Sequence, residues 1–141
     1  MKKILVVDQC AENRAQIKKF AYQWGTEIVA IDHAEEAADV LRGENPPQVF
    51  LVDWNSEDLQ TLDLVRQIRE LTTGSASYII VMGEPNQGEQ LEDAFAAGAD
   101  DFLAKPFEKS ELRARVLEAE RVLSRHESIE EAISRIAPEA N

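Results

Sequence analysis

Two kinds of apolar pattern alternate along this chain: short unbroken runs, and longer stretches in which apolar residues recur every three or four positions. Short runs bounded by turn signals are typical of strands buried on both faces, and the longer spacing is that of one face of a helix. The short runs predict strands at residues 3–8, 26–31, 48–53, 78–82 and 101–104. The longer stretches predict helices at residues 11–24, 34–42, 59–71 and 87–97, and a last helix from about residue 109.

Glycine and proline residues separate these elements. Gly25 and Gly98 follow the first and fourth predicted helices, at positions where glycine commonly ends a helix. Residues 43–47 contain one glycine and two prolines and predict a loop. Strands that alternate with helices along a chain form a parallel sheet with helices on both faces. We therefore expect an α/β fold with a doubly wound parallel sheet.

Charged residues stand at the ends of several predicted strands. Asp8, Asp53 and Lys105 fall at the carboxyl ends of the first, third and fifth strands, and Gly83 follows the fourth. In doubly wound sheets, ligands bind beyond these ends, where the strand order reverses. Two acids and one lysine in such places are more than a globular domain needs for stability. The pattern therefore predicts a functional site at this edge of the sheet.

The last predicted helix is longer than this fold requires. Its apolar positions fall on alternating steps of three and four residues, interrupted by Arg115 and His126; they are Leu112, Ala119, Val122, Ile129, Ile133 and Ile136. That spacing is the one used by coiled coils. We expect a domain at residues 1–122 and a helical extension or linker at residues 123–141, which could form a homodimer. The alternative is a helix that packs back on its own domain.

Charge and composition restrict the partners of the chain. Acidic residues outnumber basic ones by 27 to 15, which gives a net charge of −12 and argues against binding to nucleic acid or to an anionic membrane surface. No apolar run has the roughly 20 residues that a membrane span needs, and the apolar run after Met1 is too short for a signal peptide. Cys10 is the only cysteine. We therefore expect a cytoplasmic protein.

The residues at the strand ends resemble those of the receiver domain of bacterial two-component response regulators. The resemblance is most specific in residues 98–107, GADDFLAKPF, and extends over about residues 3–120. It implies a flavodoxin-like fold with a five-stranded parallel sheet in the order 2-1-3-4-5, helices on both faces and, here, an extended C-terminal helix. It also implies a role in signal transduction rather than enzymatic activity.

The resemblance assigns expected roles to individual residues. Asp53 would accept a phosphoryl group from a histidine kinase or phosphotransfer protein, and Lys105 would contact that group. Asp8, Asp53 and the backbone carbonyl of Asn55 would hold Mg²⁺, and Phe102 would occupy the aromatic switch position. A carboxylate can form an acyl phosphate when the phosphoryl group is positioned and its charge is neutralised. The domain would then regulate an output domain or a partner protein.

Two positions depart from the family pattern in ways that bear on this chemistry. Receiver domains usually have a second acid after the first strand, where this chain has Gln9, and a Thr or Ser after the fourth, where it has Gly83. We expect Mg²⁺ to bind weakly, because Gln offers a neutral oxygen in place of a charged one. Two hypotheses follow: a receiver that is still phosphorylated on Asp53, and a pseudo-receiver that binds partners without phosphorylation.

Other interpretations of these residues stay open at the sequence level. Lys105 could form an ion pair with Asp53 without any phosphoryl contact, and Phe102 could simply pack in the core. Asp8 could cap the helix that follows it. A small phosphatase with Asp53 as nucleophile is a third hypothesis, but the sequence offers no obvious second acid to act as general acid.

Overall fold

The computed structural model of the chain describes residues 2–54, 59–72, 76–85 and 88–136. Within these residues, parallel strands form a five-stranded sheet in the order β2-β1-β3-β4-β5. The strands are β1 (Lys2–Val7), β2 (Thr26–Ile31), β3 (Val49–Asp53), β4 (Tyr78–Gly83) and β5 (Asp101–Ala104). This order confirms the flavodoxin-like fold class that the sequence predicts.

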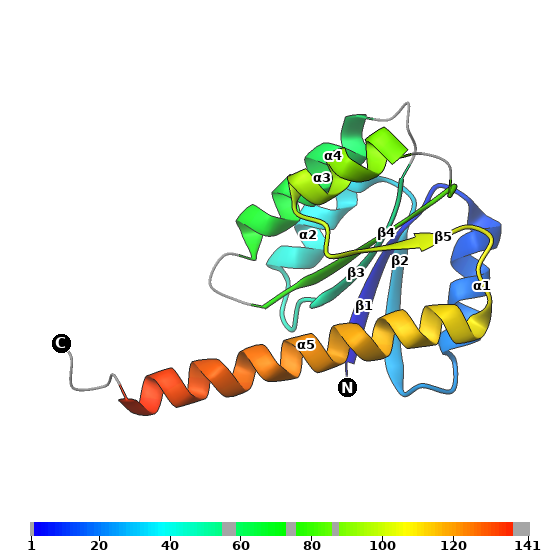
Figure 1. The fold of residues 1–141 in the computed structure, drawn as a ribbon. Coiled ribbons are helices and arrows are strands. Elements are labelled where there is room, and N and C mark those ends of the chain that lie inside the picture. Colours follow the sequence, from blue (N-terminus) through cyan, green and yellow to red (C-terminus); the bar gives the residue numbers. More distant parts are fainter. Residues whose placement is uncertain (1, 55–58, 73–75, 86–87, 137–141) are drawn as a thin grey trace.

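Helices cover both faces of the sheet (Figure 1). They are α1 (Ala11–Ala21), the short 3₁₀ turn η1 (Ala34–Glu36), α2 (Ala37–Arg42), α3 (Leu59–Leu71), α4 (Gly88–Ala97) and α5 (Lys109–Ile136). Helices α2, α3 and α4 pack against one face, and α1 and α5 pack against the other. The site predicted at the carboxyl ends of the strands therefore lies at one edge of a three-layered structure.

The central strands are apolar throughout because each of them serves both cores. In β3, Phe50 and Val52 belong to the core beneath α2, α3 and α4, whereas Val49 and Leu51 belong to the core beneath α1 and α5. Successive side chains of a strand point to opposite faces. All four of these side chains are buried, which explains why the run shows no alternation of polar and apolar residues.

Several element boundaries differ from those predicted. The first helix was expected to reach residue 24, but α1 ends at Ala21, and the chain turns through Gly25, whose φ is +68°. Trp24 lies in this turn and packs against the core beneath α1 and α5. Its apolar side chain therefore extends the helical pattern in the sequence although the residue lies outside the helix. The second helix, expected at 34–42, begins with a 3₁₀ turn before α2. The fourth was expected from residue 87, which is outside the described residues; α4 begins at Gly88.

An arginine on α3 joins that helix to the sheet. Arg69 donates hydrogen bonds from Nε to the Gly98 carbonyl, at 2.8 Å, and from Nη1 to Ser77 Oγ, at 2.8 Å. Its Nη2 forms an ion pair with Asp100, whose Oδ2 also accepts a hydrogen bond from the Ile79 backbone N–H at 2.8 Å. This cluster connects α3, the start of β4 and the turn before β5.

Helix α5 is 28 residues long and only its first half belongs to the packed domain. Its buried residues are Leu112, Val116, Ala119 and Leu123. Beyond Leu123 the helix continues past the edge of the domain (Figure 1), and its apolar residues there are exposed. No helix within the described part of the chain is long and apolar enough to cross a membrane.

Candidate functional site

The structure brings Asp8, Asp53 and Lys105 together at the carboxyl edge of the sheet. Lys105 Nζ lies 2.5 Å from Asp53 Oδ1 and 3.0 Å from Asp8 Oδ2. The three residues follow or end β1, β3 and β5, and β4 lies between β3 and β5 in the sheet. The lysine side chain therefore reaches across the end of β4 to contact both acids.

The end of β4, which the lysine crosses, is a glycine and carries no side chain. Gly83 is the last residue of β4, and its carbonyl accepts a hydrogen bond from the Lys105 backbone N–H at 2.8 Å. The next strand tip is fixed in a similar way, since the Trp54 backbone N–H donates to the Met82 carbonyl at 2.6 Å. Backbone hydrogen bonds thus hold the tips of β3, β4 and β5 in register around the site.

Asp8 is the deeply buried acid of the site. Only 1% of its side chain is exposed. Its Oδ1 accepts a hydrogen bond from the Cys10 backbone N–H at 2.9 Å, and its Oδ2 accepts one from Asn13 Nδ2 at 3.3 Å in addition to that from Lys105. A buried carboxylate is costly unless it is paired and hydrogen-bonded, and these contacts meet that requirement. The N-cap of α1 is Cys10, whose side chain makes no cap hydrogen bond; Asp8 stands two residues before it and binds its N–H, so Asp8 does not take the N-cap position that the capping alternative expects.

Asp53 differs from Asp8 in its access to solvent. Its side chain is 26% exposed, although it shares the same lysine. An incoming donor could therefore reach the Asp53 carboxylate but not that of Asp8. Of the two acids, Asp53 is the one placed to react with a group that arrives from outside.

Lys105 carries a full positive charge between these carboxylates. Burial alone would lower the pKa of its ammonium group, but hydrogen bonds to Asp53 and Asp8, and the negative charges of both, raise that pKa above the ordinary value for lysine. An opposite charge within hydrogen-bond distance favours the charged form. Two carboxylates and one ammonium give these three residues a net charge of −1, which suits the site to a further cation.

Three residues that sequence reasoning did not select also support the site. Asn13 and Arg14 in the first turn of α1 bind Asp8: Asn13 binds its carboxylate, and Arg14 Nη1 donates to its backbone carbonyl at 2.6 Å. Thr61 is buried, and its hydroxyl donates to the Asp53 backbone carbonyl at 3.2 Å. Their positions in the sequence could have indicated them, because each is a polar residue in the first turn of the helix that follows a strand of the site.

The other residues predicted for the site are Phe102, Gly83 and Asn55. Phe102 is half-buried and packs against the core beneath α2, α3 and α4, as the core-packing interpretation expects; its switch role stays a prediction. Gly83 is buried at the end of β4. Asn55, whose carbonyl was expected to bind Mg²⁺, lies outside the described residues.

The oxygen ligands present fit a magnesium ion held by few protein groups. Mg²⁺ is commonly bound through one or two carboxylates together with water, and Asp8 and Asp53 supply two. Gln9 is exposed and offers a neutral amide oxygen. Among the residues that the structure describes, no group of three or more His, Cys, Asp or Glu side chains could hold a metal ion. Glu84, which is exposed, thus does not join the two aspartates as a third acid.

Comparison with known proteins gives a consistent family assignment. The family model of the response regulator receiver domain matches residues 4–117. The chain is similar to the chemotaxis protein CheY of Bacillus subtilis, with 31% identity over 119 residues that make up 83% of this chain and 92% of that protein.

Solved structures agree with this fold. A two-component response regulator from Clostridium difficile has a TM-score of 0.73 and 27% identity, over 86% of this chain and 97% of that one. NtrX from Brucella abortus has a TM-score of 0.83 over 97% of this chain and 30% of its own. At 22% identity, the likeness to NtrX concerns the fold alone.

Proposed function

We propose, for a chain that belongs to the response regulator receiver domain family, that it takes part in two-component phosphorelay signalling by accepting a phosphoryl group on Asp53. The donor would be the phosphohistidine of a histidine kinase or of a phosphotransfer protein. The observation that carries the proposal is the contact of a solvent-accessible Asp53 carboxylate with the Lys105 ammonium, at 2.5 Å.

The chemistry requires little more than position and charge. An Asp53 carboxylate oxygen attacks the phosphorus, the bond from phosphorus to the donor imidazole nitrogen breaks, and the imidazole leaves with the electron pair and takes up a proton from solvent. Phosphoryl transfer depends mainly on alignment and on neutralisation of the charge on the phosphoryl oxygens. Lys105, held cationic by two carboxylates, would provide part of that neutralisation.

Magnesium would be the second source of positive charge. Asp8 and Asp53 are the residues that would hold the ion, which, when bound, supplies a Lewis acid beside the phosphoryl oxygens. Because Gln9 replaces the usual second acid, we expect weaker binding than in receivers with both acids. The buried contacts of Asp8 with Asn13 and the Cys10 N–H would keep this carboxylate oriented whether or not the ion is bound.

A pseudo-receiver that binds partners without phosphorylation is the second candidate. The observation that favours it is Gly83 at the end of β4, where a hydroxyl would otherwise bind the phosphoryl oxygen. On this alternative, Lys105 and the two acids form an ion-pair cluster that stabilises the fold. In both cases we propose that α4, β5 and α5 carry the partner surface, on which Phe95 and Leu117 are exposed apolar residues.

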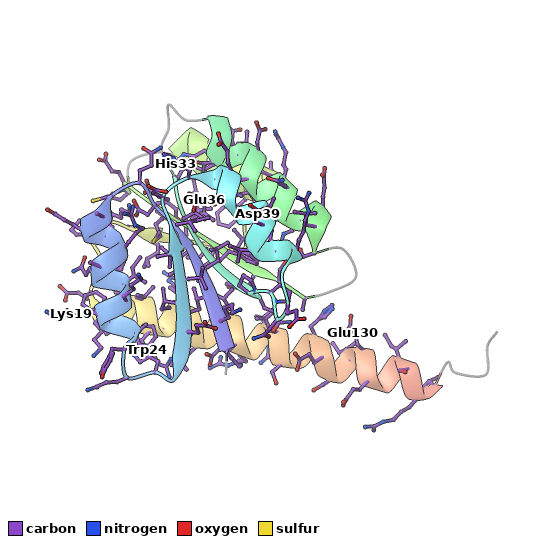
Figure 2. All side chains as sticks on the ribbon, turned by 180° about the vertical axis from the view of Figure 1, so that it is seen from behind. Lys19, Trp24, His33, Glu36, Asp39 and Glu130 are labelled. Atoms are coloured by element: carbon purple, nitrogen blue, oxygen red, sulfur yellow. The ribbon has the colours of Figure 1, made fainter. Side chains whose placement is uncertain are left out.

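Tryptophan fluorescence can separate the two candidates. Trp54 adjoins Asp53 and is buried, so its emission should change when a ligand binds the site. Trp24 lies near the end of α1 (Figure 2), where Arg113 stacks over its ring at 4.8 Å. Replacing it (Trp24→Phe) leaves Trp54 as the only reporter. We expect a response to millimolar Mg²⁺ with beryllofluoride, and loss of that response after Asp53→Asn.

Each outcome of this titration decides between the candidates. A response that depends on Asp53 supports phosphorylation. The absence of any response at millimolar Mg²⁺, in a protein that remains folded, would overturn the phosphorelay proposal and favour the pseudo-receiver. A response that persists after Asp53→Asn would place the acceptor elsewhere and also contradict the proposal.

A further inference from the structure

The second half of α5 carries an apolar seam that the domain does not cover. The seam consists of Val122, His126, Ile129, Ile133 and Ile136, on alternating steps of four and three residues. Val122, Ile129, Ile133 and Ile136 are 36%, 59%, 57% and 84% exposed. Earlier positions of the same stripe, Leu112 and Ala119, are fully buried against the sheet. One continuous helix therefore uses the same stripe first for its own core and then for a surface that the described residues of the chain leave exposed.

We propose that this seam binds the same seam of a second copy of the chain, in a parallel, in-register, two-stranded coiled coil. In heptad terms, His126 and Ile133 occupy a positions, and Val122, Ile129 and Ile136 occupy d positions. The proposal concerns the unmodified protein and does not depend on phosphorylation of Asp53.

Charge on the flanks of the seam selects the parallel arrangement. Arg125 falls at a g position and Glu130 at the following e position. In a parallel pair, g faces the e position of the next heptad on the other chain, so Arg125 of each copy faces Glu130 of the other. In an antiparallel pair, g faces g and e faces e, so Arg125 and Glu130 could not pair with each other. Glu130 lies on the projecting part of α5 (Figure 2), where a second helix has access to it.

Two features of the same helix point to a pair of helices and a modest affinity. Leu123, at an e position, is already buried against its own domain, so the domain restricts access to that flank and leaves room for one neighbour. His126 puts a polar ring at an a position, and its Nε2 lies 3.0 Å from Glu130 Oε1. A polar residue at a fixes register at a cost in stability. The free seam spans about two heptads, or roughly 20 Å, which also limits affinity.

Substitutions at His126 test the register by a gain of association. His126→Ile should tighten the dimer by about tenfold or more, because it replaces a polar layer with an apolar one. The matched control is Ser124→Ile, which adds the same side chain at an exposed f position and should leave association unchanged. Ile129→Ser should abolish the dimer without unfolding the domain, since Ile129 is exposed. Sedimentation equilibrium from micromolar to submillimolar protein measures all of these.

Charge exchange tests the orientation. Arg125→Glu and Glu130→Arg should each weaken the dimer in the parallel arrangement, and the double variant should restore it. An antiparallel pair would show no such rescue. Ile129→Cys and Ile136→Cys, each in a Cys10→Ser background, should both form disulfide-linked dimers on oxidation, while Ser124→Cys should not.

The proposal is overturned if the chain and its His126→Ile variant are both monomeric at submillimolar concentration. It is also overturned by a mass of three or more chains, or by cross-linking at only one of the two seam positions. Failure of phosphorylation at Asp53 would leave this result unaffected, because every measurement here uses the unphosphorylated protein.

Discussion

Lys105 Nζ and Asp53 Oδ1 lie 2.5 Å apart although the two residues are 52 positions apart in the chain. They come from strands that are not neighbours in the sheet, since β4 separates β3 from β5. The lysine side chain therefore spans the end of β4, whose last residue is Gly83. The same glycine that removes the usual hydroxyl thus borders the path by which the lysine reaches its two acids.

Removing the Lys105 charge should destabilise the fold through Asp8. Lys105→Met leaves the Asp8 carboxylate, 1% exposed, without its cation, and we expect a loss of about 1–3 kcal/mol in the free energy of unfolding. Urea denaturation measures it. Asp8→Asn in the same chain should recover part of the loss, because the amide needs no cation. Lys19→Met on the exposed surface of α1 is the matched control. Equal effects of the two lysine substitutions would contradict this account of Asp8.

Stability should also fall at alkaline pH in a way that depends on Lys105. Its pKa is higher in the folded chain than in the unfolded one, where lysine titrates near 10.4. The stabilisation is therefore complete below about pH 10.4 and is lost as the pH rises through the higher folded pKa. Tyr78 changes stability with pH in the same direction. Burial, and then the charges of Asp101, Asp100 and Glu118, raise its pKa above the ordinary value for tyrosine.

Unfolding measured from about pH 8 to pH 12 separates these two groups. The slope of the free energy of unfolding against pH should become shallower above about pH 10 in Lys105→Met, and again when Tyr78→Phe is added. A profile for the double variant that matches that of the unchanged chain would show that other groups control alkaline unfolding.

Restoring the usual receiver residues should strengthen metal binding. Gln9→Asp adds a charged oxygen next to Asp8, and Gly83→Thr adds a hydroxyl at the end of β4. We expect the double variant to bind Mg²⁺ at least about tenfold more tightly, since magnesium affinity rises with carboxylate ligands. Calorimetry measures it, with the neutral Gln9→Asn as control. No gain in Mg²⁺ affinity would count against the view that these two departures weaken the site.

Two glycines allow a matched test of the Arg69 cluster. A Cβ at Gly98 would lie 2.7 Å from Arg69 Cγ, whereas a Cβ at Gly25 would meet no atom within 4 Å. Both have positive φ, so alanine strains the backbone at both sites, and more at Gly98, whose φ of +125° lies further from the left-handed helical region than the +68° of Gly25. Gly98→Ala should cost more than Gly25→Ala, because it also displaces the side chain that binds Ser77 and Asp100. Equal losses in urea denaturation would mean that Arg69 adjusts freely.

The sheet order and the positions of the charged residues could be predicted because they depend on patterns in short segments. An apolar run that ends in one acid, as at Asp53, marks both a buried strand and the residue that it delivers to the sheet edge. Parallel strands then collect such residues at one edge. Trp24 shows the limit of the method: its spacing fits helix α1, but it contacts the core from a turn.

The supporting contacts could not be predicted because they depend on side-chain direction. Nothing in the sequence pattern predicts that the Thr61 hydroxyl binds the Asp53 carbonyl, at 3.2 Å. Asn13 and Arg14 are polar residues on a helix with many polar residues, and only the packing of α1 beside β1 turns these two toward Asp8. The burial difference between Asp8 and Asp53 likewise follows from packing.

The central claim is that Asp53 accepts a phosphoryl group beside Lys105, and intact-mass spectrometry tests it most directly. The chain is incubated with a small phosphodonor, such as acetyl phosphate, and Mg²⁺, and the product is digested to locate the modified residue. We predict a gain of one phosphoryl group on Asp53, a slower gain in Lys105→Met, and none in Asp53→Asn. An unmodified mass in the folded chain at saturating donor and Mg²⁺, or a gain that persists in Asp53→Asn, would contradict the claim.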